Sequence, residues 1–262
     1  MLDVINACKT FKITNNPLDD RVALDHVNLH IDEGEFVTII GGNGSGKSTL
    51  MNVISGGVPL DQGTIKINNN DVTKLTEYKR AKFLGRVFQD PNQGTASMMS
   101  IEENMMIATR RTRRKNLKWG FNKKDRELFI SRLASLNLGL ETRLDQKVGL
   151  LSGGQRQAVT LLMATLERPD ILLLDEHTAA LDPKTAKIVL DLTDKVVTED
   201  KITTLMITHN MKDAIKYGNR LIMMYGGKIV RDFRGEEKQN LTVEQLLNMF
   251  DHLDELSIND SN

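Results

Sequence analysis

Hydrophobic and polar positions change their spacing twice along the chain. Up to residue 89, and again from 156 to 235, short apolar runs alternate with helical stripes, a pattern typical of α/β proteins. Between residues 90 and 155 the apolar positions have helical spacing, charges are frequent and the strand signal is weak. The pattern predicts an α/β core, a helical subdomain inserted at 90–155, and a C-terminal helix and tail at 236–262. The length of 262 residues allows one large domain or two small ones.

Most of the expected strands are short apolar or alternating runs. The run at 171–174 is apolar throughout, as expected for a central parallel strand. The stretch 22–31 alternates with one slip of register, and two late runs separated by Gly226 and Gly227 indicate a hairpin. The strands nearest the N-terminus are expected to form an antiparallel portion. The predicted strands cover residues 2–13, 22–31, 36–40, 63–67, 84–88, 171–174, 203–207, 221–225 and 228–233.

Helical stripes and capping residues mark the expected helices. Asp182 followed by Pro183 fits an N-cap with proline at the first helical position. Thr242 with Gln245 fits a capping box that opens a last amphipathic helix. The predicted helices cover residues 48–55, 77–83, 101–108, 125–136, 155–166, 183–197, 211–216 and 243–253.

Composition excludes several classes of protein. The 35 basic and 35 acidic side chains balance, so no overall basic field indicates a nucleic-acid partner. With Cys8 as its one cysteine the chain forms no internal disulfide, which fits a reducing compartment. No secretory signal is visible and no apolar run is long enough to span a bilayer. If the protein works at a membrane, another chain is expected to supply the spanning helices.

Residues 41–49, GGNGSGKST, stand between an apolar run and a helical stretch. Strand, glycine-rich turn and helix in this order are the context of a phosphate-binding P-loop. The unobstructed backbone N–H groups and the helix N-terminus attract phosphate oxygens, Lys47 is expected to reach the β- and γ-phosphates, and the Ser48 hydroxyl to ligate Mg²⁺. The alternative is a glycine-rich turn that binds nothing. The expected ATP-binding residues here are Gly41, Gly42, Asn43, Gly44, Ser45, Gly46, Lys47, Ser48 and Thr49.

Two carboxylates follow the apolar run at 171–174. At the carboxyl end of a parallel strand they lie at the edge where ligands bind. Asp175 is expected to hold Mg²⁺, directly or through water, and Glu176 to polarise the water that attacks the γ-phosphate. Without a P-loop in the same chain, a solvated acidic turn is the better interpretation.

The sequence LSGGQ at 151–155 opens a helix shortly before these carboxylates. With the P-loop and the Asp-Glu strand, it resembles the ATP-binding cassette ATPases over almost the whole chain. The resemblance implies a single domain over 1–262 with a P-loop NTPase (RecA-like) α/β core. It also implies two copies facing head to tail, with ATP between the P-loop of one and LSGGQ of the other. A serine, two glycine amides and a helix N-terminus form a second anion cradle, which agrees with that role. The residues are Ser152, Gly153, Gly154 and Gln155.

Further positions match the family's motifs one by one. Gln89 matches the Q-loop glutamine, which touches Mg²⁺ or water and lies where the membrane subunit docks. Residues 181–182 match the D-loop, which crosses the dimer interface, and His209 matches the switch histidine that contacts the γ-phosphate. With Glu176, the resemblance assigns Gln89 and His209 to the catalytic set. Phe11 has two interpretations, stacking on adenine or packing in the core.

One position departs from the family's pattern. The residue after the catalytic glutamate is usually proline, and here it is His177. Proline stiffens a turn; histidine does not, and it is able to titrate near neutrality. We interpret His177 as a lineage marker rather than a new catalytic group, and the substitution puts only the rigidity of the loop in doubt.

The strongest local charge lies at 110–118, RRTRRKNLK. A solvated face of the helical subdomain is the first interpretation, contact with anionic lipid headgroups the second and nucleic acid the third. Four methionines near the expected docking surface, Met98, Met99, Met105 and Met106, fit either core packing or an adaptable contact for a partner.

The resemblance implies an ATPase that drives transport through separate permease subunits, on the inner, cytoplasmic face of the cell membrane. A cassette without fused spanning helices is more similar to importer components, which work with an extracytoplasmic binding protein. EHTAALDPKTA and the basic segment resemble bacterial cassettes of which some serve aromatic amino acid uptake. The alternative is a soluble cassette ATPase outside transport, such as one for iron–sulfur cluster assembly.

Overall fold

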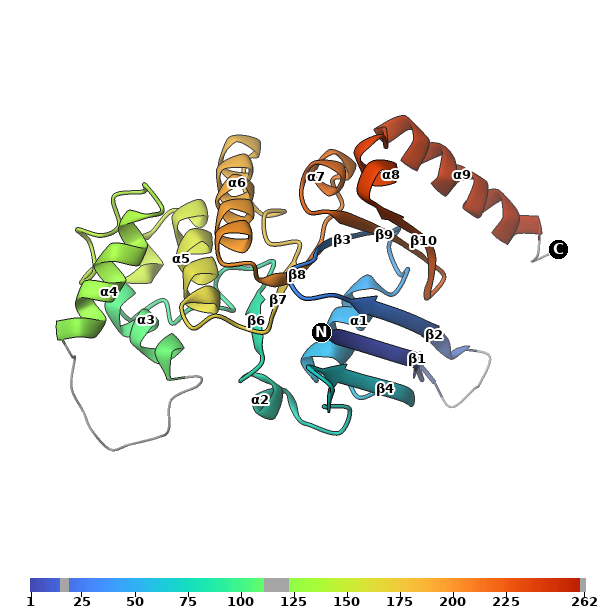
Figure 1. Ribbon diagram of the computed structural model, residues 1–262, viewed down its shortest axis with the longest axis horizontal. Coiled ribbons are helices and arrows are strands. Elements are labelled where there is room, and N and C mark those ends of the chain that lie inside the picture. The colour runs from blue at the N-terminus through green and yellow to red at the C-terminus, as the bar shows by residue number, and fades with distance from the viewer. Residues whose placement is uncertain (15–18, 111–122, 260–262) are drawn as a thin grey trace. The chain divides into compact units, whose positions relative to one another are not determined.

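The computed structural model describes residues 1–14, 19–110 and 123–259 (Figure 1). These residues form two compact units, one from Met1–Arg80 with Thr203–Asn262 and one from Ala81–Ile202. Except for Arg110, the basic segment predicted at 110–118 lies outside the described residues. Within the described ranges, no helix is long and apolar enough to cross a bilayer.

The first unit begins with an antiparallel sheet of order β2-β1-β4-β5, as expected near the N-terminus. Its strands are β1 (Leu2–Phe11), β2 (Arg21–Ile31), β4 (Gln62–Ile67) and β5 (Asn70–Asp71). The pairing of β1 with β2 shifts between Val4 and Ala7 and again on both sides of Lys9, which accounts for the slip in the alternation. Asn68 and Asn69 both have positive φ and form the tight turn between β4 and β5.

A second group of strands in this unit has the order β10-β9-β3-β8. β3 (Phe36–Ile40) runs parallel to β8 (Thr203–Ile207) and to β9 (Arg220–Tyr225), while β10 (Lys228–Arg234) forms the predicted hairpin with β9. Every residue of β3 and β8 is buried, so these apolar runs are covered on both faces.

The helices of the first unit are α1 (Lys47–Ser55), α2 (Glu77–Arg80), α7 (Met211–Lys216), α8 (Gly235–Gln239) and α9 (Val243–Asn259). Leu246 of α9 is fully buried in a cluster with Ala214 of α7 and Phe233 of β10. The predicted capping box of α9 is present, because the Gln245 N–H donates to the Thr242 hydroxyl and the Thr242 N–H to the Gln245 side chain.

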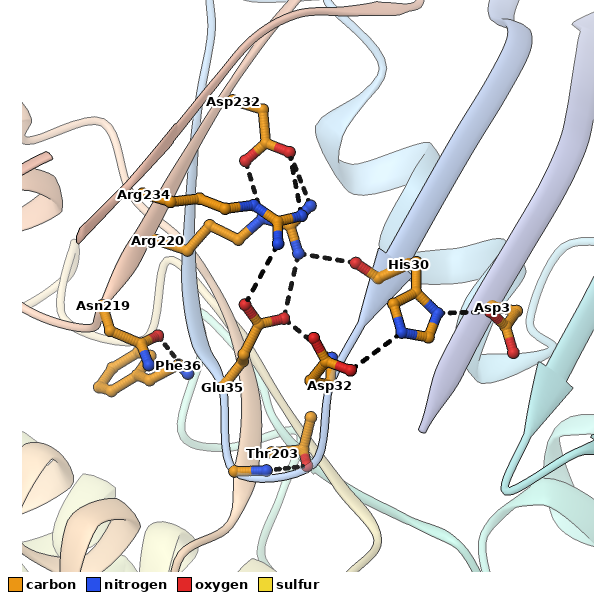
Figure 2. Close-up of polar contacts among 11 residues, drawn as sticks. Asp3, His30, Asp32, Glu35, Phe36, Thr203, Asn219, Arg220, Asp232 and Arg234 are labelled. Atoms are coloured by element: carbon orange, nitrogen blue, oxygen red, sulfur yellow. Dashed lines mark hydrogen bonds and ion pairs between the residues drawn. The ribbon is translucent and has the colours of Figure 1, made fainter. Parts of the chain in front are cut away.

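A buried arginine connects three strands of the first unit and the residue that precedes a fourth, as Figure 2 shows. Arg220 of β9 donates two bonds to the Asp232 carboxylate of β10, at 2.7 and 2.8 Å. Its Nη1 donates to Glu35, just before β3, at 3.1 Å and to the backbone carbonyl of His30 in β2 at 2.6 Å. Although burial acts to raise it, the bonds from Arg220 hold the pKa of Asp232 below its usual range. The guanidinium thus ties the antiparallel sheet to the parallel strands.

A second buried arginine, Arg80, lies at the C-terminal end of α1. Its guanidinium donates only to backbone carbonyls: to Val53 and Ile54 in the last turn of α1, at 2.5 and 2.8 Å, and to Leu75 and Thr73, at 3.0 and 2.8 Å. The sequence pattern predicted that Arg80 lies in the middle of a helix over 77–83. In the structure α2 ends at Arg80, three residues earlier.

The second unit contains one strand pair and the helical subdomain. β6 (Leu84–Val87) runs parallel to β7 (Ile171–Asp175). The helices are α3 (Ile101–Thr109), α4 (Lys123–Ala134), α5 (Gly153–Thr165) and α6 (Pro183–Glu199), with a short 3₁₀ turn at Val148–Leu150. Helices α3, α4 and α5 surround one apolar core that includes the fully buried Met105 and Phe129, so Met105 fills the core (Figure 1).

Candidate nucleotide site

The predicted P-loop joins β3 to α1 in the first unit. Gly46 is the N-cap of α1 and has φ 101°, a left-handed conformation that glycine adopts without strain. A Cβ on Gly46 would also lie 2.4 Å from the carbonyl oxygen of Ala23. Glycine at this position therefore lets β2 and the loop approach closely, which sets the direction of the N-terminus of α1.

Lys47, the first residue of α1, is only 5% exposed. Its ammonium group donates to the carbonyl oxygens of Gly41 and Gly42, at 2.8 and 3.0 Å, and lies 3.5 Å from the Ser45 hydroxyl. Held over the loop in this way, the charge adds to the partial positive charge of the helix N-terminus. Asn43, Gly44 and the Ser48 side chain are exposed beside it, and Thr49 is partly buried. The loop is therefore suited to a polyphosphate.

His209 lies at the same edge of the parallel strands as the P-loop. Ile39 of β3 is in register with Ile207 of β8, and the Thr208 N–H donates to the Ile39 carbonyl at 3.2 Å. His209 follows directly and is exposed, ahead of Asn210, which caps α7. The carboxyl ends of two adjacent strands therefore carry the P-loop and this histidine.

Phe11 ends β1 and is 39% exposed, so it is not a core residue. It pairs with Arg21, the first residue of β2. The Arg21 side chain reaches the P-loop, where a Cβ on Gly44 would lie 2.0 Å from the guanidinium. Arg21 was not among the predicted site residues. The sequence does carry a signal for it, since a charged residue stands at the start of a strand shortly before the P-loop.

Asp175 and Glu176 end β7 in the second unit, as predicted. Asp175 is partly exposed, and Arg86 of the neighbouring strand β6 donates to its carboxylate at 3.5 Å. Arg86 also lies 4.6 Å from the centre of the Phe88 ring. Glu176 has φ 47°, an unusual conformation for a residue with a Cβ. Arg86 was not among the predicted site residues, although a charged residue within a short, otherwise apolar strand could have indicated a polar contact.

His177 points away from solvent and is 2% exposed. Burial lowers the pKa of His177 to about 4, so the imidazole is neutral at neutral pH. The expectation that it titrates near neutrality is wrong, because the sequence does not reveal that its side chain lies inside the protein.

The LSGGQ residues open α5 with a complete capping box. The Ser152 hydroxyl accepts from the Gln155 N–H at 3.3 Å, and the Gln155 side chain accepts from the Ser152 N–H at 3.2 Å. Ser152 and Gly153 are exposed, so the helix begins at a free surface of this unit, two residues earlier than predicted. An exposed helix N-terminus with a serine and glycine amides is suited to an anion.

The two glycines of this motif pack against the segment that follows β7. A Cβ on Gly153 would lie 3.1 Å from the Leu181 side chain, and a Cβ on Gly154 would lie 2.1 Å from Cγ2 of Thr185. Glycine at 154 therefore lets α5 lie directly on the first turn of α6.

Gln89 follows β6 and is exposed. The carbonyl of the preceding Phe88 accepts a bond from the fully buried Gln157 of α5, at 3.2 Å. Gln157 thus fixes the start of the loop that carries Gln89, a role for which the sequence gives no signal because the residue lies within a helical stripe.

The predicted residues fall into two sets. The first unit brings together the P-loop and His209 at one strand edge, with Phe11 at the end of β1. The second unit brings together Asp175, Glu176 and the LSGGQ motif, with Gln89 after the neighbouring strand. Among the described residues, no cluster of three or more His, Cys, Asp or Glu side chains forms a metal cage of its own.

The family model described as ABC transporter matches residues 24–179. The tyrosine transport ATP-binding protein of Clostridioides difficile is 47% identical over 253 residues, which cover 96% of this chain and 99% of that protein. The methionine import ATP-binding protein of Clostridium tetani is 34% identical over 240 residues, covering 87% and 72%.

Solved structures give the same result. The ATP-binding cassette MJ0796, in a dimeric post-hydrolysis state bound to ADP and Pi, has a TM-score of 0.76 and 32% identity, covering 89% of this chain and 98% of that one. The ADP conformation of the cassette MJ1267 has a TM-score of 0.74 and 30% identity, covering 92% and 93%.

The chain belongs to the ABC transporter family and is an ATPase of that family. The predicted P-loop α/β fold and the ATPase activity are thereby confirmed.

Proposed function

We propose that two copies of this chain bind ATP between them, each γ-phosphate meeting Lys47 of one copy and Ser152 of the other. Two observations support this. Lys47 is held over its own loop by the Gly41 and Gly42 carbonyls, and the Ser152 end of α5 is exposed and closed by a capping box. Each surface is a half-site for phosphate, so a shared ligand uses both. The ADP-bound relative was also solved as a dimer.

In this proposal Glu176 is the general base for the attacking water and His209 contacts the γ-phosphate. Gln89 touches the metal or its water, and Phe11, which is exposed at the end of β1, stacks on adenine. The base is the role best suited to Glu176, because it directly follows the strand that carries Asp175.

Mg²⁺ fits the donors that are present. In phosphate sites this ion takes one or two carboxylates and completes its shell with phosphate oxygens and water, so no cage of protein carboxylates is required. Asp175, Gln89 and the exposed Ser48 hydroxyl supply oxygens of the right kind. The ion neutralises charge on the β- and γ-phosphates.

The transport system proposed is an importer for a small solute such as an aromatic amino acid. In it the chain lies on the inner face of the cell membrane, bound to separate permease subunits and served by an extracytoplasmic binding protein. The observation that carries this proposal is the 47% identity, over nearly the full length of both chains, to a protein named for tyrosine transport. We also propose that residues 1–262 form a single domain.

The shared site is tested with Glu176→Gln, which keeps the shape of the side chain but is not a base. We expect this variant to bind ATP, to stall before hydrolysis and to be a dimer in ATP and a monomer in ADP, as measured by light scattering. Ser152→Arg on the same background fills the second half-site and is expected to abolish the dimer. A monomer at saturating ATP and high protein concentration contradicts the shared site.

The transported solute is tested by uptake in cells that lack the gene. Radiolabelled tyrosine, phenylalanine, tryptophan and methionine are offered to cells complemented with the wild type or with Lys47→Ala, which serves as the matched inactive control. Uptake of tyrosine restored by the wild type alone supports the proposal. If uptake of all four amino acids is the same with and without the gene, the proposal is contradicted.

A further inference from the structure

The residue after Glu176 is hydrogen-bonded to the middle of α6. His177 Nε2 lies 3.1 Å from the Thr193 hydroxyl, and both side chains are buried. The Thr193 hydroxyl also lies 2.8 Å from the carbonyl oxygen of Val189, which can only accept. Because the hydroxyl donates its one hydrogen there, His177 must be the donor, so the hydrogen network assigns the imidazole proton to Nε2.

This contact fastens one end of the loop at residues 176–182, and the other end is fastened to the same helix. Asp182 is the N-cap of α6, and its carboxylate accepts from the Thr185 N–H at 3.1 Å. Within the loop, the Ala179 N–H donates to the Glu176 carbonyl at 2.9 Å. Thr193 lies about 15 Å along α6 from its first residue. The loop is therefore attached to one rigid helix at two well-separated points.

Glu176 needs such support because of its backbone. Its φ of 47° is left-handed, and a residue with a Cβ adopts this conformation only when its surroundings impose it. A proline at position 177 would restrict the loop directly, because its ring fixes the φ of that residue. In this chain that position is His177, whose side chain is instead hydrogen-bonded to Thr193.

We propose that His177 is a positioning residue for ATP hydrolysis: through its bond to Thr193 it holds the loop so that the Glu176 carboxylate keeps the orientation that the reaction needs. The proposal rests on the role of base proposed above for Glu176. The same loop carries Leu181, against which Gly153 of the LSGGQ motif packs. A loop fastened to α6 in this way also links the position of that motif to Glu176 within one chain.

The test compares variants that keep the hydrogen bond with variants that remove it. His177→Gln retains an N–H donor at the end of a side chain of similar reach, and His177→Leu removes it. Thr193→Ser retains the hydroxyl, and Thr193→Val removes it. For each purified chain, kcat and KM for ATP are measured well below its melting temperature.

We expect His177→Leu and Thr193→Val each to lower kcat by about tenfold and to leave KM within about twofold. The Gln and Ser variants are expected to keep kcat within about threefold of the wild type. The double variant is expected to be no slower than either single one, because both remove the same contact.

Three outcomes overturn the proposal: equal loss of kcat in His177→Leu and His177→Gln, changes in KM that match those in kcat, or additive losses in the double variant. If His177→Leu does not fold, the Thr193 pair decides alone. Glu176→Gln separates the two proposals. If it is inactive while His177→Leu is fully active, only the positioning role fails; if it hydrolyses ATP normally, the role of Glu176 fails.

Discussion

The close contact between α5 and α6 predicts a specific effect of one added methyl group. In Gly154→Ala the new methyl carbon would start 2.1 Å from Cγ2 of Thr185. Carbon atoms pack at about 3.5–4.0 Å, so the helices must separate by more than 1 Å or Thr185 must leave its rotamer. Overpacking of this kind costs about 1–3 kcal/mol, partly offset by the higher helix propensity of alanine, at most about 1 kcal/mol.

The expected net loss in the free energy of unfolding is about 1–2 kcal/mol, equivalent to a fall of about 2–4 °C in melting temperature for a chain of this size. Melting is followed by circular dichroism without nucleotide, and ATPase activity is measured in parallel. Because Ser152 and Gly153 move with α5, activity is expected to fall as well.

Two matched variants control this prediction. Gly153→Ala places a methyl group 3.1 Å from Cδ2 of Leu181, the mobile end of a side chain, and is expected to change the melting temperature little. Thr185→Ser deletes the methyl group in the way of Gly154→Ala, so the double variant is expected to recover most of the stability. A Gly154→Ala chain as stable as the wild type, or a double variant with no recovery, refutes the reasoning.

Three further predictions concern the first unit. Lys47→Ala is expected to abolish ATP binding in a fluorescent-nucleotide titration, with an unchanged circular dichroism spectrum, because it removes the charge that lies over the P-loop carbonyls. Arg220→Met leaves Asp232 and Glu35 with the more distant and more exposed Arg234 and is expected to cost about 2–3 kcal/mol in urea unfolding, discounted because Asp232 is about a third exposed; Asp232→Asn, which keeps an acceptor, is expected to cost less. The protonated His30 imidazole donates to the carboxylates of Asp3, which has the larger effect, and Asp32, and these bonds raise the pKa of His30. Its small contribution to stability is therefore present below pH 6.5 and is lost as the pH rises through the higher folded value. Asp3→Asn is expected to flatten that pH dependence in thermal melts, and an unchanged slope contradicts the assignment.

Elements with a local signal could be predicted from the sequence. Asp182 and Pro183 do open α6, and Gly226 and Gly227 do turn the hairpin, because capping and turn residues act within a few positions of the chain. Each predicted strand is present within two residues of its expected start and end. The start of α5 was placed two residues late because glycine has a low helix propensity, which the packing against α6 overrides.

The site was predictable as motifs but not as contacts. The positions of the P-loop and of Glu176 follow from strand and glycine patterns, yet Arg21 and Arg86 came to light only in the structure. His177 shows the limit most clearly, since burial against α6 and the bond to Thr193 depend on residues far along the chain. Charge and pKa depend on such long-range neighbours, so a residue type alone does not reveal them.

The guanidinium of Arg80 has an electrostatic consequence for α1, the helix that follows the P-loop. Among the described residues its hydrogen bonds go to carbonyls alone, two of them in the last turn of α1, so the negative end of the helix dipole serves as its counter-ion. Lysine could not reproduce this, because its ammonium has three donors and no planar fork. Because a fixed internal cation neutralises the C-terminal end of α1, the positive end at Gly46 is the end of the helix dipole that remains to interact with a ligand. The two ends of one nine-residue helix together favour phosphate binding.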